Sequence, residues 1–359
     1  GAILTFPCLN YTVDGDRVFS ACTDTDGFVQ RSDGSCALEC PSPILTDDQE
    51  DQLWYLHSIV GWFSMAACIF MIITYLIDPM RRRFPHRMAL FVCISTSLIA
   101  LGFILPSLAG SFGRVWCGDV DSVGPGELAS DSLCIFQGIL IMYGSLASVI
   151  WWAQMGVNTA WLTCRTKIKL STRSSTGPPS KREIIFHLIG WIVPIILVAV
   201  AGGTEHIGYQ SYSTYCFVDA DKDEENDYVI GTWIVPVSIC LLVGTLSFVT
   251  TLFRLFYVRY LANSPMPTKH LIRIIRIIIF LFFFLYFYIL IFIQKSINEA
   301  DRETQGDSLG DWVRCQFSST DLDCDAIIEE ARDFDLQMVS DFNLAVQGFV
   351  VAMIFLLDI

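Results

Sequence analysis

Long apolar segments alternate with shorter polar ones along this chain. Six segments are long and apolar enough to cross a bilayer core of about 30 Å, which takes roughly 20 helical residues. They cover about residues 53–77, 88–109, 133–164, 184–201, 229–258 and 271–293. A seventh, at about 336–357, is less uniformly apolar because Asp341, Asn343 and Gln347 interrupt its first half.

Helices are the expected form of these segments, since backbone groups in lipid must be hydrogen-bonded internally and the alternating pattern of a β-barrel is absent. The sequence thus predicts an all-α membrane protein with a seven-transmembrane helix bundle. We expect two parts, a short disulfide-bonded N-terminal linker at 1–52 and a seven-transmembrane domain at 53–359. The chain begins at Gly1 without an initiator Met and ends with the seventh span, so we interpret it as processed or trimmed.

The basic residues gather in alternate loops. Fifteen of the 23 lie in the loops after the first, third and fifth spans or at their borders, and only three acidic residues lie on that side. These acids are Asp78, Glu183 and Asp358. By the positive-inside rule the basic loops face the cytoplasm. The prediction is a multi-pass plasma-membrane protein with an extracellular N-terminus and an internal C-terminus; without the seventh span the chain would end outside.

Composition narrows the function classes. Hydrophobic residues make up 53% of the chain, charged residues 17%, and the mean hydropathy is +0.50, which is too apolar for a water-soluble fold. The net charge of −14 argues against a nucleic-acid partner. The acidic run Asp219–Asp223 lacks the glycine and terminal glutamate of a calcium loop. We expect no metal and no cofactor. The common motifs of membrane proteases and hydrolases are absent, so an enzyme is not expected.

The cysteines divide by compartment. Four lie within spans or on the inner side and are expected to be free, namely Cys68, Cys93, Cys164 and Cys240. Nine lie on the outer side, where disulfides form: Cys8, Cys22, Cys36, Cys40, Cys117, Cys134, Cys216, Cys315 and Cys324. Nine is odd, so one lacks a partner in the chain. The sequon Asn10-Tyr11-Thr12 marks Asn10 as a candidate glycosylation site.

Several short motifs follow one another in a fixed order. They are Cys36-Ala37-Leu38-Glu39-Cys40, Arg83-Phe84-Pro85-His86-Arg87, Ile150-Trp151-Trp152, Phe186-His187 with Trp191 and Pro194, and Tyr215-Cys216-Phe217-Val218. In order and spacing the chain resembles the Frizzled/Smoothened (class F) receptors over about residues 36–286. Two features depart from that pattern: the family's cysteine-rich domain is absent, and no tryptophan follows Trp312.

The resemblance implies a cell-surface receptor that relays an extracellular or lipid ligand to a cytoplasmic transducer such as a heterotrimeric G protein. A seven-helix receptor of another class, cyclic-AMP-like or adhesion-like, is an alternative. A transporter or channel is a weaker one, because no internal repeat is present and acidic residues avoid the middle of spans one to six. A second copy of the chain is a further candidate partner.

The resemblance also implies disulfide pairs and a switch. Cys134 is expected to join Cys216, Cys40 to join Cys117, and Cys315 to join Cys324, while Cys36 pairs with Cys8 or Cys22. Arg276, low in the sixth span, corresponds to a basic residue that latches the inactive bundle onto the seventh span. The alternative for Arg276 is that it merely extends to the membrane interface.

Ligand and transducer surfaces complete the expectations. For a sterol, lipid or small-molecule ligand, the polar groups of the upper bundle are the candidates: Tyr215, Asp219, Asp341 and Asn343. These groups are equally explained as satisfied within the bundle. The transducer-facing candidates are Arg81, Arg82, Arg83, Arg254, Arg259, Lys269 and Arg273, which also serve as topology determinants.

Overall fold

The structure is a computed structural model. It describes residues 11–13, 16–18, 28–30, 36–39, 46–79, 81, 84, 87–117, 122–123, 132–164, 181–204, 206–209, 214–218, 227–257, 268–300 and 334–356. Within these ranges seven helices are long and apolar enough to cross a membrane, which confirms the predicted bundle. The seventh has the lowest mean hydropathy of the seven, 1.6, as its polar residues led us to expect.

Four spans are single helices and three contain a π-helical turn. The single helices are α3 (Arg87–Ala109), α5 (Ser132–Cys164), α10 (Thr268–Ala300) and α13 (Phe334–Leu356). The first span joins α1 (Asp47–Tyr55), η2 (Leu56–Val60) and α2 (Gly61–Ile77). The fourth joins α6 (Lys181–His187), η3 (Leu188–Ile192) and α7 (Val193–Gly203), and the fifth joins α8 (Asp227–Val229), η4 (Ile230–Ile234) and α9 (Val235–Phe256).

Proline explains two of these π-helical turns. Pro194 and Pro236 are each the second residue of the α-helix that follows the turn. A proline has no backbone N–H and its ring clashes with the carbonyl one turn earlier. A single wider π-helical turn relieves that clash and keeps the helix continuous.

The first helix begins earlier than the apolar pattern indicates. Thr46 caps it: the Thr46 hydroxyl accepts from the Gln49 backbone N–H, and the Gln49 side chain accepts from the Thr46 backbone N–H. This capping box satisfies two N–H groups that the helix itself leaves unpaired. The polar turn Asp47–Asp51 therefore extends the first span beyond the apolar segment.

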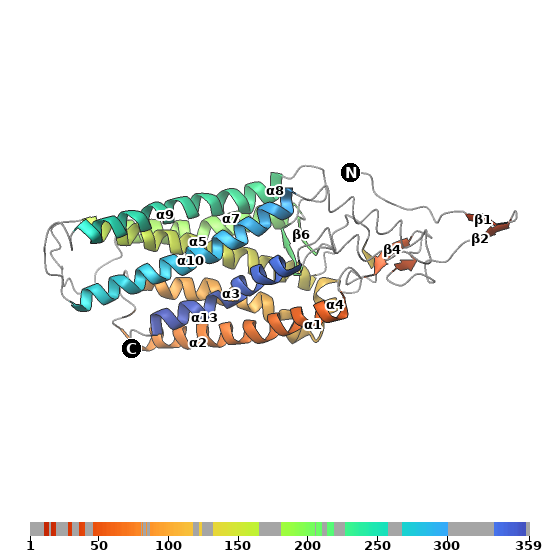
Figure 1. Cartoon of the computed structure of the whole chain (residues 1–359), viewed down its shortest axis with the longest axis horizontal. Helices are drawn as coiled ribbons and strands as arrows, with labels where there is room; N and C mark the ends of the chain where they lie inside the picture. The colour runs from red at the N-terminus through yellow and green to blue at the C-terminus, as the bar shows by residue number, and fades with distance from the viewer. Residues whose placement is uncertain are drawn as a thin grey trace.

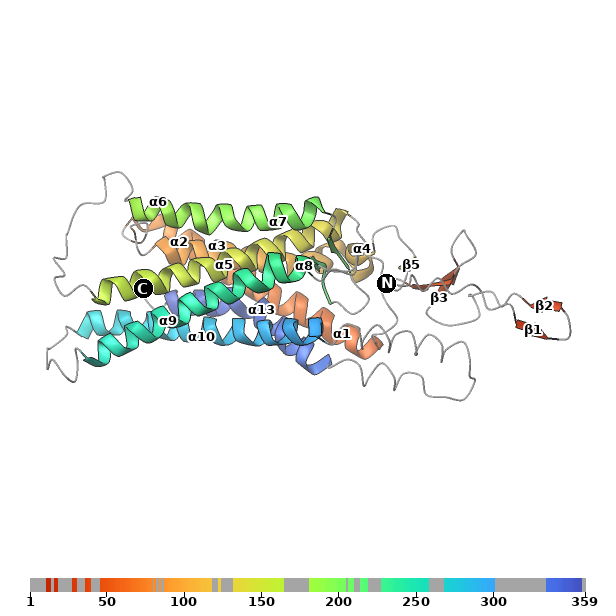
Figure 2. The same cartoon turned by 90° about the horizontal axis from the view of Figure 1, so that it is seen from above.

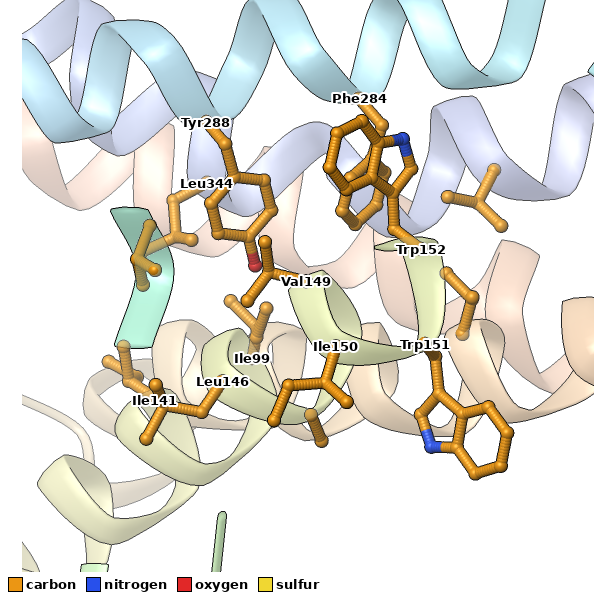
Figure 3. Close-up of a cluster of buried hydrophobic side chains, with 14 of the residues drawn as sticks. Ile99, Ile141, Leu146, Val149, Ile150, Trp151, Trp152, Phe284, Tyr288 and Leu344 are labelled. Atoms are coloured by element: carbon orange, nitrogen blue, oxygen red, sulfur yellow. The ribbon is translucent and has the colours of Figure 1, made fainter. Parts of the chain in front are cut away.

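The third span is the centre of the bundle. α5 packs along α3 on one side and α9 on another, and α13 packs against α2, α3 and α10 (Figures 1 and 2). Trp151 and Trp152 of α5 are almost completely buried and point to different sides of the helix (Figure 3). Gly190 and Gly244 make room for them, because a Cβ at either position would overlap the facing indole ring.

One end of the bundle carries a small hairpin, and we call it the hairpin end. β6 (Ile207–Gly208) pairs antiparallel with β7 (Phe217–Val218), with Ile207 opposite Val218. The short helix α4 (Phe112–Trp116) lies at the same end (Figure 1). The remaining strands are β1 (Tyr11–Val13), β2 (Asp16–Val18), β3 (Phe28–Gln30), β4 (Cys36–Glu39) and β5 (Ser122–Val123), with β4 between β3 and β5.

Candidate functional site

The hairpin is fixed to the third span by a covalent and a polar anchor. A disulfide joins Cys134, in the first turn of α5, to Cys216 next to β7, which is the pairing that the family resemblance implies. One turn further along α5, the side-chain oxygen of Gln137 accepts a hydrogen bond from the Cys216 backbone N–H at 3.0 Å. The side-chain NH₂ group of Gln137 donates to the backbone carbonyl of Gly102 in α3, also at 3.0 Å. Gln137 therefore joins two spans and the hairpin.

Asp341 of α13 lies beside this anchor and is fully buried. Its carboxylate accepts from the Thr214 hydroxyl at 2.5 Å and from the Gln337 amide at 2.9 Å. The Nε2 atom of His57, in η2, lies 3.4 Å from Oδ2 of the same carboxylate. A buried charge is stable only where it is paired and hydrogen-bonded, and Asp341 meets this condition through three separate parts of the chain.

The hydrogen bonds continue from the seventh span to the sixth. The side-chain NH₂ group of Gln337 also donates to the Thr214 hydroxyl at 2.8 Å. The side-chain oxygen of Gln337 accepts from the side-chain NH₂ group of Gln294. The Ser340 hydroxyl donates to the Gln294 carbonyl oxygen at 3.0 Å. We call these six buried residues the outer polar cluster: His57, Thr214, Gln294, Gln337, Ser340 and Asp341.

Aromatic rings surround this cluster. The His57 imidazole lies between the rings of Phe103 and Phe112, with centroids 4.8 and 5.6 Å away. The Tyr215 ring packs against Phe103, and the Lys295 Nζ atom lies 5.0 Å from the centroids of both Tyr215 and Phe217. Burial, together with the Asp341 charge, raises the pKa of the Tyr215 phenol well above its usual range. Tyr215 is therefore a neutral hydrogen-bonding group.

Of the four predicted ligand-pocket residues, the structure brings Tyr215 and Asp341 together. Asn343 is buried too, but two residues along a helix place it about 200° around the axis from Asp341, on another face of α13. Asp219 lies outside the described residues. The sequence analysis missed His57, Thr214, Gln294, Gln337 and Ser340; for His57 and Gln294 a polar residue near the end of an apolar span was the available signal.

A second polar group joins the third, fifth and sixth spans. The Tyr288 hydroxyl donates to the Ser145 carbonyl at 2.7 Å and lies 2.5 Å from the Ser148 hydroxyl. The Trp233 indole N–H of η4 donates to the Ser145 hydroxyl at 3.4 Å. One turn earlier on α10, Phe284 stacks on Trp152, whose indole N–H donates to the backbone carbonyl of Leu281 (Figure 3). α10 is thus hydrogen-bonded to α5 at two levels.

The opposite end holds the basic residues of the predicted transducer face. Arg81 pairs with Asp78 at 3.2 Å, and Arg254 lies over the Tyr257 ring. Arg276 is half-buried on α10, one turn before Phe280, whose ring contacts Phe355 of α13 at 5.1 Å. Three predicted residues fall outside the described parts of the chain, Arg82, Arg83 and Arg259; for Lys269 and Arg273 only the helical backbone is described. The latch remains a prediction.

The remaining cysteines that the structure describes are bonded or free as the sequence analysis expects, apart from Cys36, for which only the strand position is given. Cys117 is disulfide-bonded, and Cys68, Cys93, Cys164 and Cys240 are free. Cys36 begins β4. The other pairing candidates lie outside the described residues, as does Asn10, so these disulfides and the glycan remain predictions; the cysteines concerned are Cys8, Cys22, Cys40, Cys315 and Cys324.

Comparison with known proteins decides the family. A family model for the Frizzled/Smoothened family membrane region matches residues 44–356. The chain belongs to the Frizzled/Smoothened family. This assignment favours class F over the other seven-helix classes and identifies the chain as a multi-pass membrane protein of a receptor-type family.

Three relatives illustrate the range of this family. Frizzled/smoothened-like sans CRD protein E of Dictyostelium discoideum is 30% identical over 262 residues, which are 71% of this chain and 54% of that protein. Protein smoothened of Danio rerio is 22% identical over 64% of this chain and 27% of its own length. Frizzled-6 of Canis lupus familiaris is 22% identical over 67% and 33%. The chain spans about half the length of the Dictyostelium protein and about a third or less of the length of the other two.

Proposed function

We propose that this chain is the seven-helix signalling module of a cell-surface class F receptor. In this proposal the hairpin end is extracellular, and the basic end meets a cytoplasmic transducer such as a heterotrimeric G protein. The ligand is a sterol, lipid or small molecule that acts at the hairpin end. The observation that carries the proposal is the outer polar cluster, because it joins the first, sixth and seventh spans to the loop that a ligand would meet first.

The energetics of the cluster support a switching role. Leaving a buried polar group without its partner costs about 1–3 kcal/mol. Asp341 and Gln337 share the Thr214 hydroxyl, so a ligand that moves the loop changes the satisfaction of both side chains. Such a ligand favours whichever helix arrangement restores those hydrogen bonds. A differential interaction of this size is sufficient to shift a two-state equilibrium.

The sixth span supplies a direct connection to the other end. α10 is one continuous helix, with Gln294 in the outer cluster, Tyr288 bonded to α5 in the middle and Arg276 near the basic end. A change at Gln294 is therefore transmitted along a single rigid element. We propose that Arg276 is part of the latch between the sixth and seventh spans, next to the Phe280–Phe355 contact. The basic residues of this end then face the transducer.

A matched pair of threonine substitutions tests this proposal. Thr214→Val removes the hydroxyl that bonds Asp341 and Gln337, whereas Thr250→Val removes a hydroxyl that bonds only the Leu246 carbonyl of its own helix. In a cell assay of transducer activation at equal surface expression, we expect Thr214→Val to change ligand-independent signalling several-fold and Thr250→Val to leave it at the wild-type level.

Equal signalling by the two threonine variants and the wild type would refute the role of the outer polar cluster. Arg276→Ala provides the output arm of the same assay, since loss of the latch is expected to raise ligand-independent signalling. If Thr214→Val acts through the sixth span, the double variant will signal no more than Arg276→Ala alone. Additive signalling would place the two residues on separate routes.

A further inference from the structure

His57 and Asp341 form a buried pair of ionisable side chains. The two side chains are 1% and 0% exposed, and they connect the first span to the seventh. Imidazole is the side chain whose charge ordinarily changes between pH 5 and 8. An ionisable pair inside a membrane bundle is costly to keep, which by default indicates a functional role.

The second ring nitrogen of His57 faces no hydrogen-bonding group among the described residues. In the neutral ring, with Nε2–H directed at Asp341, the buried Nδ1 atom is an acceptor without a hydrogen-bond partner among the described residues. Protonation removes that acceptor and makes the ring a cation beside the Asp341 carboxylate, while the Phe103 and Phe112 rings make T-shaped contacts with it. The carboxylate of Asp341 is already buried, so a proton on His57 makes the pair neutral as a whole.

The other groups near the imidazole come from four helices and the loop. α13 contributes Asp341, α3 contributes Phe103, and α4 contributes Phe112. The loop contributes the Tyr215 phenol, which stays neutral because burial raises its pKa. α10 contributes Lys295, whose Nζ atom lies 5.0 Å from the centroid of the Tyr215 ring, and lysine ammonium groups ordinarily stay charged between pH 5 and 8. The imidazole is thus the variable charge of this group.

We propose that His57 and Asp341 form a proton-binding site that couples pH at the hairpin end to the packing of the first and seventh spans. A bound proton replaces a neutral hydrogen bond by an ion pair, and so strengthens the contact between η2 and α13. The same carboxylate oxygen accepts from Thr214, so the loop is held in the same network. That the sensed protons are extracellular rests on the orientation given in the proposed function; the proton site itself does not.

Thermal unfolding across pH tests the site in the purified full chain. The unfolding midpoint is measured in lipid nanodiscs at intervals from pH 5.5 to 8.0 for the wild type and His57→Gln, whose amide still donates to Asp341 but does not titrate. Between pH 8.0 and 5.5 the midpoint of the wild type should rise relative to His57→Gln by about 2–4 °C, since the ion pair forms only in acid.

His206→Gln is the matched control. His206 is the other described buried imidazole at the hairpin end; it is 4% exposed and stacks on Tyr228 at 3.9 Å, and no acidic partner is found for it among the described residues. His206→Gln should keep the pH profile of the wild type. Asp341→Asn should lose the acid gain, because protonated His57 then has no anion beside it. An identical profile in His57→Gln and the wild type would overturn the proposal.

A second measurement follows the imidazoles directly and does not require the His57→Gln variant. In wild-type protein labelled with ¹⁵N-histidine, one of the five imidazoles should titrate within this pH range, and its midpoint should move in Asp341→Asn. Histidine midpoints that all stay in place in Asp341→Asn would also overturn the site. The purified chain contains no transducer, so failure of this proposal and failure of the receptor proposal are separate results.

Discussion

The two ends of the bundle are built differently. At the hairpin end a disulfide, the Gln137 bridge and the outer polar cluster join five spans and a loop, and most of the polar atoms involved are hydrogen-bonded to one another. At the basic end the described polar residues form pairs at the edge of the bundle, such as Arg81 with Asp78.

Buried polar atoms without a hydrogen-bond partner among the described residues occur at both ends, and at the hairpin end they include His57 Nδ1, Trp116 Nε1 and His206 Nδ1. The side-chain oxygens of Gln154 and Asn158, on the half of α5 towards the basic end, are buried and lack hydrogen-bond partners among the described residues. Arg87 and Glu183 pair nearby, across α3 and α6. Each buried acceptor without a donor costs about 1–3 kcal/mol. The two ends therefore differ in how their elements are joined, by a disulfide and a hydrogen-bonded cluster at the hairpin end and by separate ion pairs at the basic end.

Removing the disulfide should give the largest effect. Cys134→Ala together with Cys216→Ala opens a loop of 82 residues in sequence separation, and closing such a loop typically contributes about 2–4 kcal/mol. We expect a lower unfolding midpoint and faster hydrogen exchange in β6 and β7. Cys164→Ala removes an exposed free thiol at the basic end and should change neither quantity. An unchanged midpoint in the double variant would remove the contrast between the two ends.

Gln137→Leu should give an intermediate effect. The substitution keeps the side-chain volume but leaves the Cys216 N–H and the Gly102 carbonyl without their buried partner, at about 1–3 kcal/mol. Hydrogen exchange of the Cys216 amide should accelerate while the disulfide stays formed. If exchange at Cys216 keeps its wild-type rate, the disulfide alone holds the hairpin and the polar anchor adds nothing.

Asp78→Asn should give the smallest effect. The Asp78 and Arg81 side chains are 40% and 15% exposed, and partly exposed ion pairs contribute about 0–1 kcal/mol. The unfolding midpoint should shift by less than that of Gln137→Leu, and the shift should shrink further at high salt because ions screen the pair. A loss as large as that of Gln137→Leu would show that the basic end is as firmly fixed as the hairpin end.

The seventh span shows how far sequence reasoning reached and where it stopped. Asp341, Asn343 and Gln347 read as interruptions that weaken the span, and the structure does give it the lowest mean hydropathy. The same residues pointed to the bundle interior, and Asp341 is indeed at the centre of the outer polar cluster. Its partner His57 was missed, because nothing local to residue 57 indicates an acidic residue 284 positions away.

The sequence by itself determined the number of spans and the family motifs. Transfer of a segment into lipid is a sum over its own residues, so each span can be recognised without knowing its neighbours. Only the tertiary structure decided which polar groups meet: His57 with Asp341, Thr214 with Gln337, and Gln137 with the hairpin. These contacts depend on the rotation and register of helices packed against one another, and those are set by side chains such as Trp151 and Trp152 fitting against glycines on other spans.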